Sequence, residues 1–449
     1  MFQKYDEGTL KTVVNMALPS IAESFFVSFA GLVDAYMVSS LGANAVASVG
    51  LTTQPKMIGL AVFTAINVSI SALVARRFGE KKRSEANSIL MTALWMIVTL
   101  AVVISCAFVA FAPRIISMCG STPETHDGAV AYFSIIMGGM IFNCIQMGIN
   151  AAQRGAGNTR ITMRTNITSN LINVLFNYLL IQGHIGFPAL GIRGAALASV
   201  LGTVVSSIMS LLSILKQESF VSLTYIIQEK IKPSLASLKN IIKVCYSVFL
   251  EQLLMRVGFL STAVMAANQG SAAMAAHQVC MNILSLSFSF GDGLQVAAVA
   301  LNGRSLGEGK PEKAKEFGRA CLLLGSIISV CVAVTYFFGA RRAMQLFFAE
   351  EEIIQIGTII MRIVILVVLF QIRQMIYTGC LRGAGDTRFT AFTSMLSVAV
   401  MRSVVGYICA YPLGMGLAGI WLGIVSDHVT RYILNGLRFR SGKWTTIKI

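Results

Sequence analysis

The chain alternates between long apolar runs and short polar connections. A helix that crosses a lipid bilayer needs about 20 mostly apolar residues. Twelve segments meet this requirement: 12–37, 46–74, 87–111, 128–152, 160–182, 190–215, 239–266, 273–301, 316–339, 352–380, 388–411 and 415–438. The pattern therefore predicts an all-α integral membrane protein with 12 transmembrane helices.

A motif recurs after 228 residues and divides the chain into two similar halves. Residues 154–160 read RGAGNTR and residues 382–388 read RGAGDTR, and the same offset maps Glu23 onto Glu251. Each repeat holds six spans, an even number, so both repeats enter the membrane with the same orientation. We expect two parallel six-helix bundles related by a pseudo-two-fold axis along the membrane normal. The expected parts are an N-lobe over 1–215, a cytoplasmic linker over 216–238 and a C-lobe over 239–449.

The placement of basic residues predicts the orientation. The net charge is +16, from 36 Lys and Arg against 20 Asp and Glu. Most basic residues fall in connections on one side, from Lys4 at the start to a tail running from Arg431 to Lys448, whereas Arg114 lies in an opposite loop. Basic loops remain in the cytoplasm. Both termini are therefore expected to be cytoplasmic.

Composition excludes several classes of protein. Mean hydropathy is +0.72, and charged residues make up 12% of the chain, about half the share of soluble domains. The basic residues form no cluster interleaved with aromatics, so no nucleic-acid partner is expected. The nine Cys form no CxxC or Cys/His metal pattern, and no Gly-Lys-Ser/Thr phosphate loop occurs. Four His residues are too few for an intramembrane zinc site, and no Ser/His or paired-Asp set appears within the spans.

Among the acids within the predicted spans, we single out Glu23, Asp34, Glu251 and Asp292 as candidates. A charge at the bilayer centre costs about 2.5–3.5 kcal/mol on insertion scales, so such acids are functional candidates. Glu23 and Asp34 are eleven residues apart, which places them on one face of a helix about 16 Å apart. Pro19 removes one backbone hydrogen bond and is expected to act as a hinge.

Together, these features resemble the multidrug and toxic compound extrusion (MATE) transporters of prokaryotic type. The resemblance covers essentially the whole chain. It rests on Pro19 followed by Asp34, on the two RGAG-[Asn/Asp]-Thr loops, on Ala275-Ala276-His277-Gln278, and on the Asn-x3-Asn spacing of Asn173 and Asn177. It implies export of cationic, lipophilic compounds in exchange for H⁺ or Na⁺, across a bacterial or archaeal plasma membrane.

The resemblance also implies a site. Asp34 matches the N-lobe acid of the family, and Asn173, Asn177 and Ser199 match its partners. Glu251 matches the C-lobe cation-binding Glu, and Gln371 stands where relatives carry an Asp. Asn177 also replaces an Asp of many relatives, so each lobe keeps one strong acid, and Na⁺ could bind at Asp34 or Glu251. We expect Gln371 to lie near enough to Glu251 to share a ligand.

Other intramembrane polar residues leave alternatives open. Lys56, beside Pro55, is either a switchable ion-pair partner for Asp34 or Glu23, or a snorkelling or fixed structural residue. Arg256 and Arg402 are interpreted as mainly structural, and His277 as a residue that hydrogen-bonds at a helix end.

The leading hypothesis is a secondary antiporter with proton coupling favoured, since a proton needs a single carboxylate. The alternative is a lipid-linked oligosaccharide flippase of the same superfamily. We expect no cofactor, no enzymatic activity, small organic cations and membrane lipid as partners, and a monomer.

Overall fold

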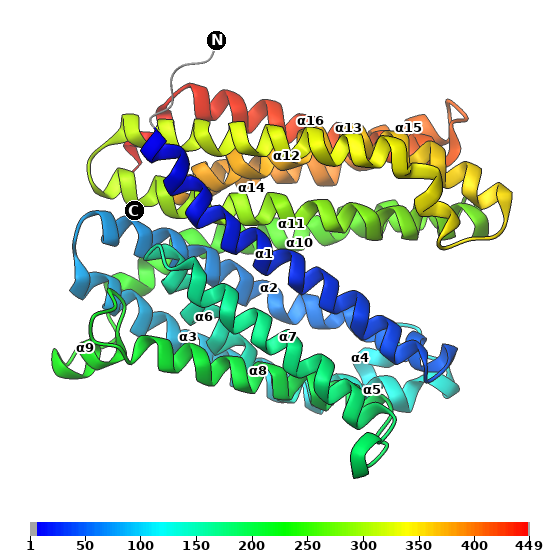
Figure 1. The fold of residues 1–449 in the computed structure, drawn as a ribbon, viewed down its shortest axis with the longest axis horizontal. Helices are drawn as coiled ribbons and strands as arrows, with labels where there is room; N and C mark the ends of the chain where they lie inside the picture. The colour runs from blue at the N-terminus through cyan, green and yellow to red at the C-terminus, as the bar shows by residue number, and fades with distance from the viewer. Residues whose placement is uncertain (1–6, 448–449) are drawn as a thin grey trace. The chain divides into compact units, whose positions relative to one another are not determined.

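The computed structural model describes residues 7–447, and this part of the chain is helical, without strands (Figure 1). Lys4 and Lys448 lie outside the described residues. A π-helix, Met395–Met401, joins α14 to α15. The α-helices are α1 (Glu7–Ser39), α2 (Ala43–Gly79), α3 (Arg83–Ala110), α4 (Ala112–Met118), α5 (Pro123–Gly138), α6 (Met140–Gly155), α7 (Thr159–Ile181), α8 (Ile192–Ile214), α9 (Leu223–Gln228), α10 (Leu235–Ala267), α11 (Ser271–Gly307), α12 (Pro311–Gln345), α13 (Glu351–Gly383), α14 (Thr387–Ser394), α15 (Arg402–Ala410) and α16 (Gly416–Arg440).

Every predicted span corresponds to helix, but the spans differ in polarity. Within residues 7–447, nine helices are long and apolar enough to cross a membrane, and a tenth is counted if the bent pair α5 and α6 is one span. The other two predicted spans are α7 and α16, of 23 and 25 residues. Both carry buried polar side chains, including Asn173 and Asn177 on α7 and Asp427 and Arg431 on α16. Their low hydropathy therefore reflects polar positions directed into the protein.

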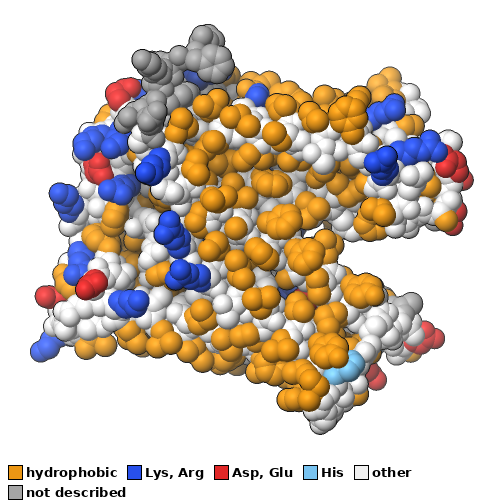
Figure 2. Space-filling model, viewed as in Figure 1, with side chains coloured by type: hydrophobic (Ala, Val, Ile, Leu, Met, Phe, Trp, Pro, Cys, Tyr) orange, Lys and Arg blue, Asp and Glu red, His pale blue; other side chains and the backbone are white. Residues whose placement is uncertain are grey.

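The outer surface suits lipid. Figure 2 shows hydrophobic side chains covering broad areas of the helices, with Lys and Arg gathered toward helix ends. Large apolar residues are exposed along the spans, such as Leu171 on α7 and Leu260 on α10, at 63% and 65% exposed. Bilayer lipid would cover such surface, which a soluble domain would have to bury.

The chain forms two compact units. One comprises residues 25–245, and the other combines the chain up to Ser24 with residues 246–449. These divisions fall inside α1 and α10 instead of in the expected linker, 216–238. Part of that segment is attached to α3, where the Asn87 amide donates to the Phe220 carbonyl (2.9 Å) and accepts from the Ser222 N–H (2.8 Å).

A polar triad sits inside the unit of residues 25–245. Asn150 on α6 donates from Nδ2 to Thr165 Oγ1 on α7 (3.1 Å), and Ser210 Oγ on α8 donates to Asn150 Oδ1 (3.1 Å). Asn150, Thr165 and Ser210 are all buried. One amide therefore connects three helices where lipid offers no hydrogen bonds.

The other unit contains the same triad with the amide on a different helix. Asn435 on α16 donates from Nδ2 to Thr378 Oγ1 on α13 (3.0 Å), and Thr393 Oγ1 on α14 donates to Asn435 Oδ1 (2.9 Å). Thr378 and Thr393 lie 228 residues after Asn150 and Thr165, and Asn435 lies 225 after Ser210. The repeat thus preserves a three-helix junction although the residue types have exchanged places.

A charged cluster holds the second unit together around Asp427 on α16. Arg402 Nη2 lies 2.8 Å from Asp427 Oδ2, and Arg431 Nε lies 2.8 Å from Asp427 Oδ1. Asp427, Arg402 and Arg431 are 0%, 2% and 8% exposed. The Arg402 guanidinium also stacks over the ring of Phe259, 4.7 Å from its centre. The expected place of Arg431 in a cytoplasmic tail is therefore wrong, because a buried acid one helical turn away draws it inward.

We predict that Asp427→Asn destabilises the protein, because it leaves two buried guanidinium groups with a neutral amide as partner. Breaking a buried ion pair from one side costs about 3–5 kcal/mol. Thermal unfolding of the purified protein in detergent should show a clearly lower midpoint. Asp127→Asn, at an exposed acid on α5, is the matched control and should unfold like the wild type. Equal midpoints for both variants would contradict the prediction.

Candidate functional site

Asp34, near the end of α1, faces a row of polar groups on α7 and α8. Asn177 Nδ2 donates to Asp34 Oδ1 at 2.6 Å. Asn173 lies one turn earlier on the same face of α7. Its amide is satisfied when the nitrogen faces Asp34 Oδ1 and Oδ2 (2.5 and 3.1 Å) and the oxygen accepts from the Ser199 N–H and Oγ (3.1 and 2.9 Å). This orientation is assigned from the hydrogen-bond network. The residues expected around Asp34, namely Asn173, Asn177 and Ser199, are thus brought together.

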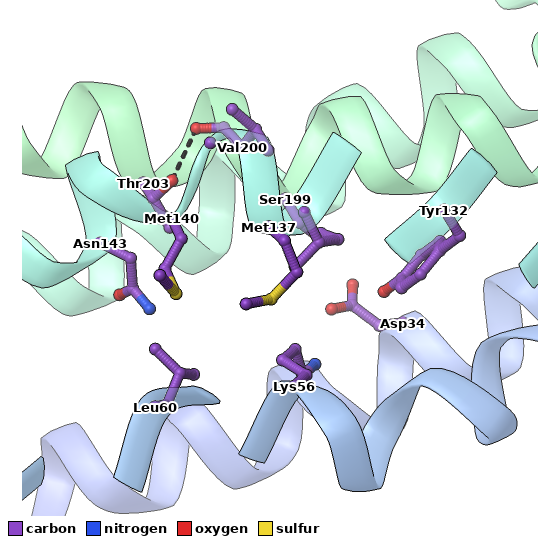
Figure 3. A pocket seen from close by; sticks show the side chains of 12 residues that line it. Asp34, Lys56, Leu60, Tyr132, Met137, Met140, Asn143, Ser199, Val200 and Thr203 are labelled. Atoms are coloured by element: carbon purple, nitrogen blue, oxygen red, sulfur yellow. Dashed lines mark hydrogen bonds between the residues drawn. The ribbon is translucent and has the colours of Figure 1, made fainter. Parts of the chain in front are cut away.

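Asp34 lines a cavity of about 230 Å³ inside the unit of residues 25–245 (Figure 3). Its lining contains one acid, Asp34, and one base, Lys56. Figure 3 shows both side chains reaching into the same space, with Tyr132, Met137 and Ser199 around them. The other lining residues are Leu60, Ile136, Gly139, Met140, Asn143, Val200 and Thr203. The cavity therefore combines mostly uncharged walls with one charge of each sign.

The wall formed by α5 and α6 depends on a break at Gly139. The expected span 128–152 is bent there by 45°. A Cβ on Gly139 would lie 2.6 Å from both methyl carbons of Val200 on α8. Only glycine allows α8 to approach this closely. The break places Met137 and Met140 on either side of the bend, and both line the cavity.

The Lys56 side chain lines the cavity. It lies thirteen residues after Ala43, the first residue of α2, which corresponds to about 20 Å of helix rise. A lysine side chain cannot reach that helix end. Within the described residues, no ion pair of 4.0 Å or less joins Lys56 to Asp34 or to another acid. The structure thus places Lys56 in the same cavity as Asp34, beyond ion-pair distance, and its role as a switchable partner or as a snorkelling or fixed structural residue stays a prediction.

The second unit arranges Glu251 differently from expectation. Glu251, 2% exposed, accepts from Arg382 Nη2 (2.6 Å) and from Ser394 Oγ (2.5 Å). Arg382 was expected in a loop, but it occupies the last turn of α13 and is buried. Its guanidinium supplies the positive charge that a cation would otherwise bring to Glu251.

Gln371 does not join this group. It lies eleven residues before Arg382 on the same helix, about 16 Å along the axis. Neither side-chain polar atom of Gln371 has a hydrogen-bond partner within the described chain. The structure thus shows no hydrogen bond between Gln371 and the Glu251 group, and a ligand shared by Gln371 and Glu251 stays a prediction. Its repeat equivalent, Asn143, lines the cavity beside Asp34.

Glu23 and Asp34 belong to different compact units, although one helix carries both. Glu23 is buried on the part of α1 that packs against α11. There a Cβ on Gly293 would lie 2.5 Å from the backbone nitrogen of Ile21, and Ser289 Oγ donates to the Ser24 carbonyl (3.2 Å). Pro19 is buried in the same continuous helix. The single acidic stripe expected along α1 is thus divided between two packing environments.

The sequence analysis missed Asp427 as an intramembrane acid and Arg382 as the partner of Glu251. The spacing of Asp427 and Arg431, four residues apart inside the last span, was the available signal. His277 packs its ring edge-on against Trp421, with ring centres 5.6 Å apart.

Comparison with known proteins identifies the family. The MatE family model matches residues 19–179 and again 248–408, so its two matches begin 229 residues apart, close to the 228-residue repeat. A probable multidrug resistance protein NorM from Thermotoga maritima is 27% identical, covering 97% of this chain and 93% of that protein. The multidrug resistance protein MdtK from Edwardsiella ictaluri is 26% identical, covering 96% and 95%.

A solved structure of a multidrug resistance MATE family transporter, in an outward-facing conformation, matches with a TM-score of 0.90. Identity is 22%, over 98% of this chain and all of that one. The likeness confirms the predicted fold of 12 transmembrane helices in two bundles. The chain belongs to the MATE family of multi-pass membrane transporters, and it is not an enzyme.

Proposed function

We propose that this transporter exports cationic, lipophilic compounds in exchange for protons, by alternating access, with Asp34 as the coupling acid. The observation that carries the proposal is a single carboxylate in a largely uncharged cavity, held by the amides of Asn173 and Asn177. The names of the relatives, which are multidrug resistance proteins, support the substrate class.

Competition at Asp34 supplies the coupling. A proton and an organic cation each neutralise the carboxylate, so binding of one weakens binding of the other. The soft thioethers of Met137 and Met140 and the ring of Tyr132 suit apolar, aromatic parts of a substrate. Each change between outward and inward access would then carry either a proton or a substrate.

Sodium is the second candidate for the coupling ion. Asn177 Oδ1 is buried without a hydrogen-bond partner among the described residues, and it could add a neutral oxygen to the Asp34 carboxylate. The proton is favoured because one carboxylate is enough to bind it. Within residues 7–447, no group of three or more His, Cys, Asp or Glu is arranged to hold a metal ion.

We place the protein in the plasma membrane with both termini cytoplasmic. The proposal rests on the basic residues at the ends of α2 and α11 and in the connections that follow them, including Arg77 and Lys82. Arg77 and Lys82 also bind Glu80, at 2.6 and 3.5 Å. Partial burial opposes ionisation of Glu80, but these two cations outweigh it and lower the pKa of its carboxyl group.

We predict that Asp34→Asn abolishes proton-driven transport. Sodium-free proteoliposomes with an acidic lumen should accumulate a fluorescent organic cation, because protons leaving the lumen drive the cation inward. Asp34→Asn should lower the initial rate by about tenfold or more, since the cavity has no other acid. Asp127→Asn is the control and should transport at the wild-type rate.

Two outcomes would contradict this account. A full rate in the Asp34→Asn variant would remove Asp34 from the mechanism. An absolute requirement of the wild type for sodium, with no response to the pH gradient, would reverse the ion assignment.

The orientation predicts that Cys119 reacts from outside the cell. Cys119 is exposed just after α4, in the connection that carries Arg114. Partial burial of Cys119 raises the pKa of its thiol. Labelling should therefore be done at about pH 8 or above, where more thiolate forms. A membrane-impermeant maleimide should label intact cells that carry the wild type, and label Cys119→Ser less. Labelling of Cys119 only after permeabilisation would invert the assigned orientation.

A further inference from the structure

Lys56 carries a charge that the protein leaves available in the cavity. The described residues give its ammonium group no hydrogen bond and no ion pair, whereas Asp34 across the same space is held by two amides. Asp34 is the one counter-charge that lines the cavity, and it lies beyond ion-pair distance of Lys56, so a closer anionic acceptor would interact with the ammonium group more strongly. The space in front of Lys56 is therefore suited to an anionic group.

The helix fixes Lys56 in this position. It follows Pro55, which is buried and cannot donate a backbone hydrogen bond. The charge stands about 20 Å inside α2, beyond reach of the nearer helix end.

The two charges set opposite requirements for a ligand. A simple monocation drawn to Asp34 would be repelled by Lys56, and a simple anion drawn to Lys56 would be repelled by Asp34. A ligand that carries both charges satisfies both residues. Leu60, Met137 and Met140 then offer apolar contact to the part of the ligand between its charges.

We infer that this cavity selects zwitterionic amphiphiles, with the ammonium group at Asp34 and a carboxylate or similar monoanion at Lys56. Lys56 is the specificity-determining residue, and the inference rests on the proposed function of Asp34. It narrows the substrate class from organic cations in general to those that also carry an anionic group.

The inference has an electrical consequence. A monocation exchanged for one proton moves no net charge, whereas a zwitterion exchanged for one proton moves one positive charge across the membrane. Transport of the zwitterion should therefore respond to an imposed membrane potential, and transport of a monocation should not. This readout does not depend on whether Lys56 also stabilises the fold.

The test compares an aromatic amine that bears a carboxylate with its methyl ester, in proteoliposomes driven by a pH gradient. The wild type should prefer the zwitterion, and only its transport should respond to a potassium diffusion potential. Lys56→Met should lower kcat/KM for the zwitterion by about tenfold and leave the ester unchanged or faster, since the lost partner is specific to the carboxylate. Lys56→Arg should keep the preference. Lys216→Met, which removes an exposed lysine outside the cavity, should behave like the wild type.

The outcomes separate this inference from the proposed function. An unchanged zwitterion-to-ester ratio in Lys56→Met, or a wild type that prefers the ester, would overturn the role of Lys56. The role of Asp34 would still stand if Asp34→Asn lost both substrates. If Lys56→Met does not fold, the preference and the voltage response of the wild type decide the matter. Full transport of both compounds by Asp34→Asn would instead overturn the proposed function.

Discussion

A hydrocarbon solvent offers no hydrogen bonds, so each polar group that this chain carries into the membrane must find a partner inside a helix bundle. The fold follows from that constraint. Apolar side chains such as Leu171 and Leu260 can face outward, where lipid covers them. Polar side chains collect on the inner faces of α7 and α16, the two predicted spans that are too polar to count as membrane-crossing by hydropathy alone.

Many of these buried polar groups hydrogen-bond or form ion pairs with one another. In the triad of Asn150, Thr165 and Ser210 a single amide joins three helices. The cluster of Asp427 with two arginines neutralises the acid completely, although it leaves Arg402 Nε without a hydrogen-bond partner in the described chain. Such networks hold helices together where the hydrophobic effect between helices is weak.

The Asp34 cavity is built from the same residue types, but its two charged side chains do not form an ion pair with each other. Asn173 and Asn177 hold the carboxylate, while Lys56 approaches it without closing an ion pair. Glu251 is the intramembrane acid of the other unit, and it forms an ion pair with Arg382 instead. A charge that the protein leaves partly unsatisfied can bind something else. This difference, more than the number of acids, supports the proposed role of Asp34 in transport.

Short-range features of the fold and site could be predicted from the sequence. The length of the apolar runs predicted the spans, and the RGAG repeat predicted the division into two bundles. The four-residue spacing of Asn173 and Asn177 placed both on one face of a helix, and the family resemblance implied that this face meets Asp34.

Features that depend on distant residues could not be predicted in this way. Arg382 was assigned to a loop because it follows a long apolar run, yet its partner Glu251 lies 131 residues away in sequence. Arg431 was likewise assigned to a cytoplasmic tail, although it forms an ion pair with the buried Asp427. The close packing of Gly139 against Val200 involves another helix, so no local sequence pattern predicts it.

The most direct test of the account is proton release on substrate binding by the purified protein in weakly buffered detergent solution, followed with a pH indicator across a pH series. If substrate and proton compete for Asp34, binding should release up to about one proton per substrate, by thermodynamic linkage. The Asp34→Asn variant should release none. Saturable substrate binding by the wild type with no proton release at any pH, or equal release by the variant, would contradict the central claim.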